Sequence, residues 1–450
     1  MFDVLANTVY RRLFFAQVIA LLGTGLATVA LSLLAFDLAD ADAGAVLGTA
    51  LAIKMVAYIG VAPVAQAFAD RLPRRAMLVG LDLLRAAVAL LLPFASEVWH
   101  VYVLIFVLQA GSAAFTPAFQ ATIPDVLPDE RDYTKALSLS RLAYDLESLA
   151  SPAIAALLLG VISYHGLFGG TVLGFLASAA LVLSVVVPRV KPGPARGIYE
   201  RTTRGLRIYL ATPRLRGLLA LNLAIASGSA MVIVNTVVLV QGRFGLSPNA
   251  TALALAAFGG GSMLVALRLP ALLDRFPERR VMFTGTALIA AGLLAGAFAA
   301  RHYATLLPLW FLLGIGYSLA QTPSGRLLRR SAHEADRPAL FAAQFALSHA
   351  CWLLTYPLAG WLGARAGLQA SLLTLGVLAA FATLLALKLW PAADPGEIEH
   401  AHDDLPPDHP HLQGSGQALD DPRRHRHVFV IDDEHRCWPK PGEDGPAARS

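Results

Sequence analysis

Long apolar runs, separated by short polar segments, recur along the whole chain up to about residue 390. Crossing a hydrocarbon core of roughly 30 Å takes about 20 helical residues, and an isolated strand would leave its backbone groups without hydrogen-bond partners in lipid. Each run therefore predicts one membrane-spanning helix. The predicted spans are 12–36, 44–69, 76–95, 99–123, 135–160 and 166–188, followed by 217–241, 249–273, 281–300, 304–324, 338–363 and 368–390.

These spans predict an all-α membrane protein with twelve transmembrane helices in two six-helix pseudo-symmetric bundles. A polar linker separates the two sets of spans. The segment after the last span is rich in Pro, Asp and His and poor in aliphatic residues, so we expect a mostly disordered tail. The predicted units are the first bundle at 1–188, the linker at 189–216, the second bundle at 217–390 and the His-rich tail at 391–450.

An internal repeat supports this division. The segment DRLPRR at 70–75 returns as DRFPERR at 274–280, and each copy joins one apolar span to the next. Six spans repeated in the same orientation imply two bundles related by an axis along the membrane normal, with a cavity between them. Two further matches share nearly the same offset, namely Thr116-Pro117 with Thr322-Pro323 and Pro152 with Pro357.

Composition and charge placement agree with this prediction. Of the 450 residues, 56% are hydrophobic and 15% are charged, which is typical of membrane proteins. The formal net charge of +5 does not indicate a nucleic-acid partner, because Lys and Arg gather in short loops between the spans. In the predicted topology these loops lie on the side of the linker and both termini, and the opposite loops hold only Arg243, Arg301 and Arg365. The positive-inside rule then predicts that both termini face the cytoplasm.

The repeated loop also carries a family resemblance. DRLPRR resembles the signature G-x-x-x-D-R-x-G-R-R of the major facilitator superfamily, and DRFPERR resembles its second, degenerate copy. Residues 116–158 further resemble the exporter branch that includes enterobactin exporters and macrolide efflux proteins, also called transmembrane secretion effectors. This resemblance covers residues 1 to about 390 and implies a multi-pass transporter of the bacterial inner membrane. It also implies a cytoplasmic gating motif at Asp70, Arg71, Arg74, Arg75, Asp274, Arg275, Arg279 and Arg280.

The match to the signature is partial. Gln66 and Pro73 stand where the signature has glycines, and the second copy has Pro270 and Pro277 at those places. In the fifth span, the glycines of an antiporter-like pattern are replaced by other small residues, which keep close helix packing but weaken the antiporter assignment. An ordinary charged turn that fixes topology is the alternative interpretation of the Asp-Arg loops.

Three ionisable residues inside predicted spans are candidates for proton coupling. Lys54 lies about ten residues from the outer end of its span, and Asp145 and Glu147 lie at comparable depth from the cytoplasmic end of theirs. A charge at this depth costs about 2.5 to 3.5 kcal/mol on insertion scales unless it is paired. We expect an intramembrane cluster of the three that is linked to proton movement, and a purely structural ion pair is the alternative.

Other polar residues in the spans suggest two further sets. Asp82, Arg85 and Arg141 are expected to form a charge network near the cytoplasmic side, since Asp82 and Arg85 are three residues apart and Arg141 and Asp145 are four apart. Uncharged polar side chains on spans one, four, seven and ten are expected to line the central cavity or, alternatively, to hydrogen-bond between helices. The candidates for the cavity are Gln17, Thr24, Gln109, Asn222, Asn235, Tyr317 and Gln321.

The tail holds seven of the twelve histidines, close to several aspartates. Imidazole and carboxylate groups at this density can bind nickel, zinc or cobalt transiently. No spacing typical of a zinc finger occurs, so a solvated tail without a metal role is the alternative. The candidate weak metal sites are His400, His402, His409, His411, His425, His427 and His435.

No G-x-x-x-x-G-K-[ST] loop occurs, and the loops offer no set of nucleophile, base and orienting group. Enzymatic activity, direct use of ATP and a cofactor are therefore not expected. The predicted function is proton-coupled export of a small amphiphilic molecule, drug-like or siderophore-like, by alternating access of a monomer in the lipid bilayer. The alternatives are efflux of a divalent metal of the nickel or cobalt type aided by the tail, and a receptor or scaffold built on a transporter fold.

Overall fold

A computed structural model of the protein describes residues 2–39, 43–69, 73–187, 198–394, 397–401 and 424–439. In the first half, two helices begin after a residue whose side chain satisfies free N–H groups of the first turn. The Asn7 side chain accepts hydrogen bonds from the backbone of Val9 and Tyr10, and the Asp129 carboxylate accepts from Arg131 and Asp132. The helices are α1 (Thr8–Ala39), α2 (Ala43–Ala69), α3 (Arg74–Leu91), α4 (Val98–Val126), α5 (Glu130–Leu159) and α6 (Tyr164–Leu183), after a short 3-10 helix at Phe2–Ala6 and with another at Leu92–Phe94.

The second half repeats this order after the linker helix α7 (Ile198–Ala211). Its first long helix begins at Pro213, four residues before the predicted span, and runs into a π-helical turn at Val238–Arg243. The tenth predicted span is divided at Pro323 into a long and a short helix. The helices are α8 (Pro213–Val237), α9 (Pro248–Arg275), α10 (Glu278–Ala299), α11 (Tyr303–Gln321), α12 (Ser324–Arg329), α13 (Arg337–Arg365) and α14 (Leu368–Leu389).

By length and composition, ten helices among the described residues are long and apolar enough to cross a membrane. Two predicted spans are not among the ten: α2, which has a shorter apolar stretch at 52–65 among the described side chains, and α5, which carries Arg141, Asp145 and Glu147. A multi-pass helical membrane protein is thus confirmed, and the count of twelve spans stays a prediction.

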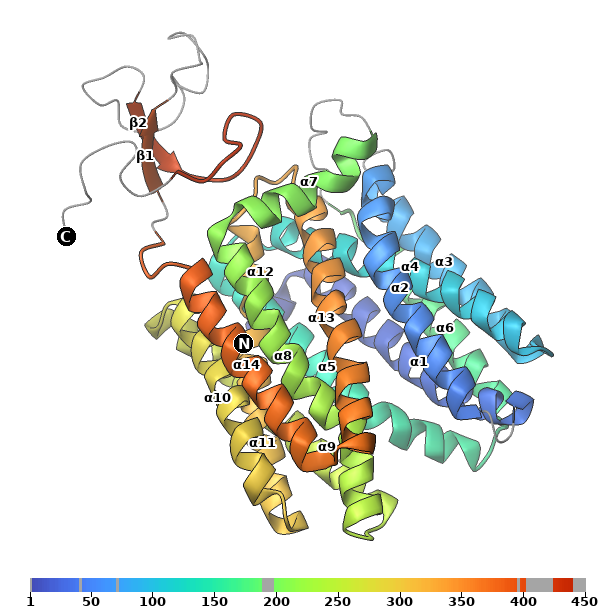
Figure 1. Cartoon of the computed structure of the whole chain (residues 1–450). Coiled ribbons are helices and arrows are strands. Elements are labelled where there is room, and N and C mark those ends of the chain that lie inside the picture. The colour runs from blue at the N-terminus through green and yellow to red at the C-terminus, as the bar shows by residue number, and fades with distance from the viewer. Residues whose placement is uncertain are drawn as a thin grey trace.

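The two halves lie side by side as separate helical bundles (Figure 1). In the first bundle, α1 packs on α6, and α3 packs on both α4 and α6. In the second bundle, α11 packs on α9 and α10, and α14 packs on α8 and α10. The halves meet where α2 packs against α13 and α5 packs against α9. The helix α7 lies at one end of this arrangement, which we call the linker end.

Part of the predicted tail is folded. Strand β1 (Glu397–Ala401) pairs antiparallel with β2 (Arg424–Val428), with His400 opposite His425. Phe429 and Ile431, directly after β2, are buried in an apolar cluster with residues of α7, α8 and α12. These contacts join segments far apart in the sequence, so local composition does not reveal them. The candidates His402, His409 and His411 lie outside the described residues.

Glycines allow the closest approach of helices in the second bundle. A Cβ atom at Gly314 of α11 would lie 1.9 Å from the carbonyl oxygen of Phe258 in α9, so α9 and α11 touch backbone to backbone. At Gly260, also in α9, the nearest atom to an added Cβ is a ring carbon of Phe311 at 3.8 Å, which is ordinary contact.

We therefore expect Gly314→Ala to force α9 and α11 apart and to lower the free energy of unfolding by roughly 1 to 3 kcal/mol, the usual cost of overpacking. Gly260→Ala is the matched control and should be neutral or slightly stabilising. The apparent Tm of each purified variant in detergent, measured by fluorescence-detected size-exclusion chromatography after heating, checks this. Equal Tm values for the two variants would show that the close approach is not required.

Candidate functional site

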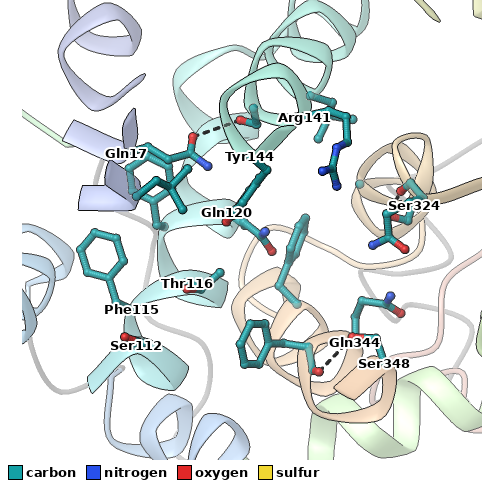
Figure 2. Close-up of a pocket in the computed structure, with 18 of the residues that line it drawn as sticks. Gln17, Ser112, Phe115, Thr116, Gln120, Arg141, Tyr144, Ser324, Gln344 and Ser348 are labelled. Carbon is teal, nitrogen blue, oxygen red and sulfur yellow. Dashed lines mark hydrogen bonds between the residues drawn. The ribbon is translucent and has the colours of Figure 1, made fainter. Parts of the chain in front are cut away.

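A cavity of about 480 Å³ lies between the two halves. Its wall is built by α1, α2, α3, α4 and α5 from the first half and by α11, α12 and α13 from the second. Figure 2 shows Gln17 of α1, Gln120 of α4 and Arg141 of α5 around the same space as Ser324 and Gln344 of the second half. The wall mixes amide, hydroxyl and aromatic side chains with a few charged ones.

Four of the seven predicted cavity residues lie in this wall: Gln17, Thr24, Tyr317 and Gln321. The amide oxygen of Gln17 accepts a hydrogen bond from the Ser140 hydroxyl, at 3.1 Å between the oxygens, which fixes the orientation of the Gln17 side chain (Figure 2).

The other three predicted residues are not in the wall. Gln109 lies one helical turn beyond the part of α4 that lines the cavity. Asn222 is buried behind it and lies 3.4 Å from the amide oxygen of Gln344. Asn235 is buried between helices, where its side-chain nitrogen donates to the carbonyl oxygen of Ala359. These two act between helices, as the alternative interpretation held, because α8 packs inside its own bundle.

Sequence reasoning missed one face of α13. Gln344, Ser348 and Trp352 recur every four residues along the cavity, with Phe345 and His349 beside them. The His349 ring lies 4.7 Å from the Tyr58 ring of α2, so it contacts the opposite half. The signal was present in the sequence, since an ionisable residue inside a predicted span is by itself a candidate functional residue.

Lys54 and Glu147 both line the cavity. The Lys54 ammonium lies 5.5 Å from the centre of the Tyr58 ring, and the Glu147 carboxylate interacts electrostatically with Lys54 and with Arg141. Two of the three proton-coupling candidates thus lie in the wall, Lys54 on α2 and Glu147 on α5. The third, Asp145 of α5, lies outside it. Their role in proton coupling stays a prediction.

Asp145 instead joins the two halves. Its carboxylate forms an ion pair with Arg141, one turn earlier on α5, and accepts a hydrogen bond from the Ser262 hydroxyl of α9 at 2.6 Å. Arg141 also lies 3.3 Å from the Tyr317 hydroxyl of α11. Two side chains of α5 thus bind two helices of the other half.

Asp82 and Arg85 form a second buried ion pair, within the first half. The Asp82 carboxylate also accepts a hydrogen bond from Ser178 of α6 at 2.7 Å. The Arg85 guanidinium lies between the rings of Phe115 and Phe175, at 4.2 and 4.5 Å from their centres, and reaches the cavity wall. Arg85 is therefore compensated by a carboxylate and by two aromatic faces.

At the linker end, Asp125 at the end of α4 holds arginines from both halves. It accepts from Arg74 of the same half and, at 3.1 Å, from Arg337 at the start of α13. Two further ion pairs cross between the halves here, Glu130 with Arg326 and Arg131 with Asp274. These contacts join the two halves at the linker end. Asp70 and Arg71, the first two residues of the predicted motif, lie outside the described residues.

The second copy of the motif is used differently. Arg279 donates to the backbone oxygen of Trp390, and Arg280 lies against the Phe276 ring. Arg275 is exposed at the end of α9. Arg330 occupies the repeat position of Asp125 and pairs with Glu278 and Asp394 inside its own half. The two loops are therefore similar in sequence but not equivalent in contacts.

Of the described tail histidines, His435 is buried and its Nδ1 lies 2.9 Å from Asp432. The His427 ring lies 5.1 Å from the His435 ring. His333, in the turn before α13, also reaches Asp432, and this hydrogen bond raises the pKa of His333 above its usual value.

Comparison with known proteins agrees with this architecture. The sequence matches the family model of the Major Facilitator Superfamily over residues 13–269 and 218–423. Macrolide efflux protein A of Streptococcus pyogenes and of Enterococcus faecalis is 29% identical over 154 residues, or 32% of this chain. That match spans only 38% and 47% of the two relatives. An uncharacterized MFS-type transporter of Bacillus subtilis (strain 168) is 25% identical over 68% of this chain and 76% of its own.

Two solved structures have the same fold. The human organic anion transporter MFSD10 (TETRAN) superposes with a TM-score of 0.72 at 14% identity, over 84% of this chain and 98% of its own. A bacterial homologue of the iron transporter ferroportin, in an outward-facing state, gives a TM-score of 0.69 at 14% identity, over 85% and 98%. With two helical bundles around one cavity and a family match along most of its length, the chain belongs to the major facilitator superfamily, whose members are membrane transporters rather than enzymes.

Proposed function

We propose that the protein exports a small amphiphilic molecule by alternating access, driven by the inward movement of protons. The observation that carries the proposal is the cavity between the halves, which is lined by ionisable groups, together with the ion pairs that join the halves at the linker end. The 29% identity to the macrolide efflux proteins over 154 residues supports export rather than import.

The wall of the cavity suits an amphiphilic cargo. Phe115, Phe345 and Trp352 offer apolar faces, while Gln120 and Gln344 offer hydrogen-bonding groups. A volume of about 480 Å³ lies within the range of sites that hold drug-sized ligands. A divalent metal is a poorer cargo, because the described wall offers it one carboxylate, Glu147, and one imidazole, His349, as strong ligands. The export of metal therefore ranks below the export of an amphiphile.

Glu147 is the residue we assign to proton coupling. It is the carboxylate in the described cavity wall, and its charge is balanced by Lys54 and Arg141. A proton on Glu147 removes its attraction for Lys54 and weakens the set of charges around Arg141, which keeps its ion pair with Asp145. Because Arg141 also contacts Tyr317 of the other half, a change of charge on α5 alters the contact between the halves. Asp145 is held by Arg141 and Ser262 and is assigned a structural role.

The positive-inside rule places the linker end at the cytoplasm of a bacterial cell, so the Asp125 cluster is the inner gate. Arg75 and Arg280 are exposed at this end, and Arg243 is exposed in a loop predicted on the opposite side.

We expect Arg75→Cys and Arg280→Cys to react with an impermeant maleimide in inside-out vesicles, and Arg243→Cys to react only in right-side-out cells. The background should carry Cys437→Ser, since Cys437 is exposed, whereas Cys351 is buried. Labelling of Arg75→Cys and Arg280→Cys from opposite faces would contradict both the orientation and the parallel repeat.

The ion pairs of the inner gate are not of equal weight. The side chains of Arg337 and Asp125 are 14% and 6% exposed, whereas those of Arg131 and Asp274 are 79% and 53% exposed. An exposed pair contributes about 0 to 1 kcal/mol, and breaking a buried pair costs about 3 to 5 kcal/mol. Asp125 keeps its ion pair with Arg74 when Arg337 is replaced. We therefore expect the replacement of Arg337 to reduce the stability of the contact between the halves by about 1 to 3 kcal/mol.

Arg337→Gln should therefore increase the population that is open at the linker end by about five- to a hundredfold, since 1.4 kcal/mol corresponds to a factor of ten. The measurement is the labelling rate of Ser324→Cys, a cavity residue below the gate, in inside-out vesicles of the Cys437→Ser background. Arg131→Gln is the matched control and should change the rate little. Equal effects of the two variants would show that the Asp125–Arg337 ion pair is not the contact that keeps the linker end closed.

Coupling is tested with the cargo found by screening a deletion strain against macrolides, siderophores and divalent metals. In inside-out vesicles, uptake should need a proton gradient, and Glu147→Gln should reduce gradient-driven uptake to the level of empty vesicles because its side chain holds no exchangeable carboxylate proton. Glu97→Gln, which changes an exposed carboxylate at the start of α4, should transport normally. Uptake that persists after a protonophore is added would overturn the coupling.

A further inference from the structure

The folded part of the tail, 424–439, is seated on the linker end of the second half. Phe429 and Ile431 are buried there, and Trp438 lies over the buried Arg214 guanidinium at 5.0 Å. Arg214 also lies 3.5 Å from the Phe429 carbonyl oxygen. The segment therefore has a defined place on the transport domain, so its polar side chains have defined neighbours.

Three potential metal ligands of this segment meet beside the turn before α13, and a fourth, His333 of that turn, contacts one of them. The ligand atoms of Asp432, Glu434 and His435 lie within 4.8 Å of one another. Nε2 of His333, from the turn, lies 3.3 Å from Oδ2 of Asp432, and Nδ1 of His435 lies 2.9 Å from Oδ1 of the same carboxylate. The group thus combines two imidazoles and two carboxylates from two parts of the chain.

The group is also partly shielded from water. His435 is buried beside the Phe429 ring, and the Asp432 side chain is 11% exposed, whereas His333 and Glu434 lie at the surface. The Asp432 carboxylate accepts the backbone N–H groups of Glu434 and His435, which holds these residues in a tight turn around it. Two imidazole nitrogens with carboxylate oxygens are the donor set of zinc and of neighbouring divalent transition metals.

We propose that His333, Asp432, Glu434 and His435 bind one divalent transition-metal ion, which fastens the tail to the turn next to the inner gate. The ion replaces the protons shared between the imidazoles and Asp432. In this proposal the metal regulates the contact between the tail and the gate. The metal is not the transported molecule, and the proposal does not depend on what that molecule is.

The turn that carries His333 leads directly into the gate. The His333 carbonyl oxygen accepts the backbone N–H groups of Asp336 and Arg337, and Arg337 is the gate residue bound to Asp125. Beside it, Arg204 of α7 binds both Asp336, at 2.5 Å, and Asp433 of the tail, at 2.7 Å. A metal at Asp432 would thus strengthen a connection between tail, linker and gate that Arg204 already makes.

The test uses the full chain in detergent with Co²⁺ as a spectroscopic probe and Zn²⁺ as competitor. The wild type should bind one Co²⁺ tightly, with the visible absorption of a low-coordinate site. His333→Asn and Glu434→Gln should each weaken binding by at least about tenfold, since loss of even an outer partner of a metal ligand costs that much. Both residues are at the surface, so both variants should fold. The control His409→Gln/His411→Gln changes two other tail histidines and should bind like the wild type.

A second readout is hydrogen exchange of peptides 330–337 and 424–439. Zn²⁺ should slow exchange of both peptides in the wild type and in the control, and in neither His333→Asn nor Glu434→Gln. Wild-type affinity in these two variants, loss of binding only in the control, or no binding in any protein would each overturn the site.

Discussion

A charge inside an apolar helical bundle is stable only when a partner compensates it, and in this protein several of the partners belong to the other half of the chain. Asp125 holds arginines from both halves, and the Arg141–Asp145 pair on α5 reaches Ser262 and Tyr317 across the interface. These contacts satisfy buried polar groups and also fix the position of one bundle against the other. For the proposed alternating access, the same requirement favours discrete states, because a partly broken set of pairs leaves charges uncompensated.

The repeat of the two halves has not kept two equal gates. Near the first copy of the motif, the buried ion pair of Asp125 and Arg337 joins the halves. Near the second copy, the halves are joined by the exposed ion pair of Arg131 and Asp274. Arg330 stands at the repeat position of Asp125 and binds Glu278 and Asp394 within its own half. The first half thus supplies Asp125, the carboxylate that binds arginines of both halves, and the second half supplies the surface on which the tail packs.

The positions of the helices could be predicted because the hydrophobic requirement of a membrane span is local. Which helix faces line the cavity depends instead on how each helix is rotated within its bundle, and the polar content of a span does not reveal this. Asn222 and Asn235 of α8 were predicted in the wall but are packed between helices. The polar face of α13, which was not predicted, lines the cavity. His349 could have been found from its depth in a span. The folded tail could not, because Phe429 and Ile431 are buried by residues of α7, α8 and α12 that are distant in sequence.

The seat of the tail bears on gating through one arginine. Arg204 is shared between Asp433 of the tail and Asp336, the neighbour of the gate residue Arg337. A ligand shifts an equilibrium only by the difference in its affinity for the two states. Tail docking therefore influences transport only if the turn from His333 to Arg337 changes its shape when the halves rock, and not if it moves as a rigid part of α13. Because the backbone of that turn caps the first turn of α13 while Arg337 is held by the opposite half, we expect the proposed movement of the halves to act on the turn at both ends.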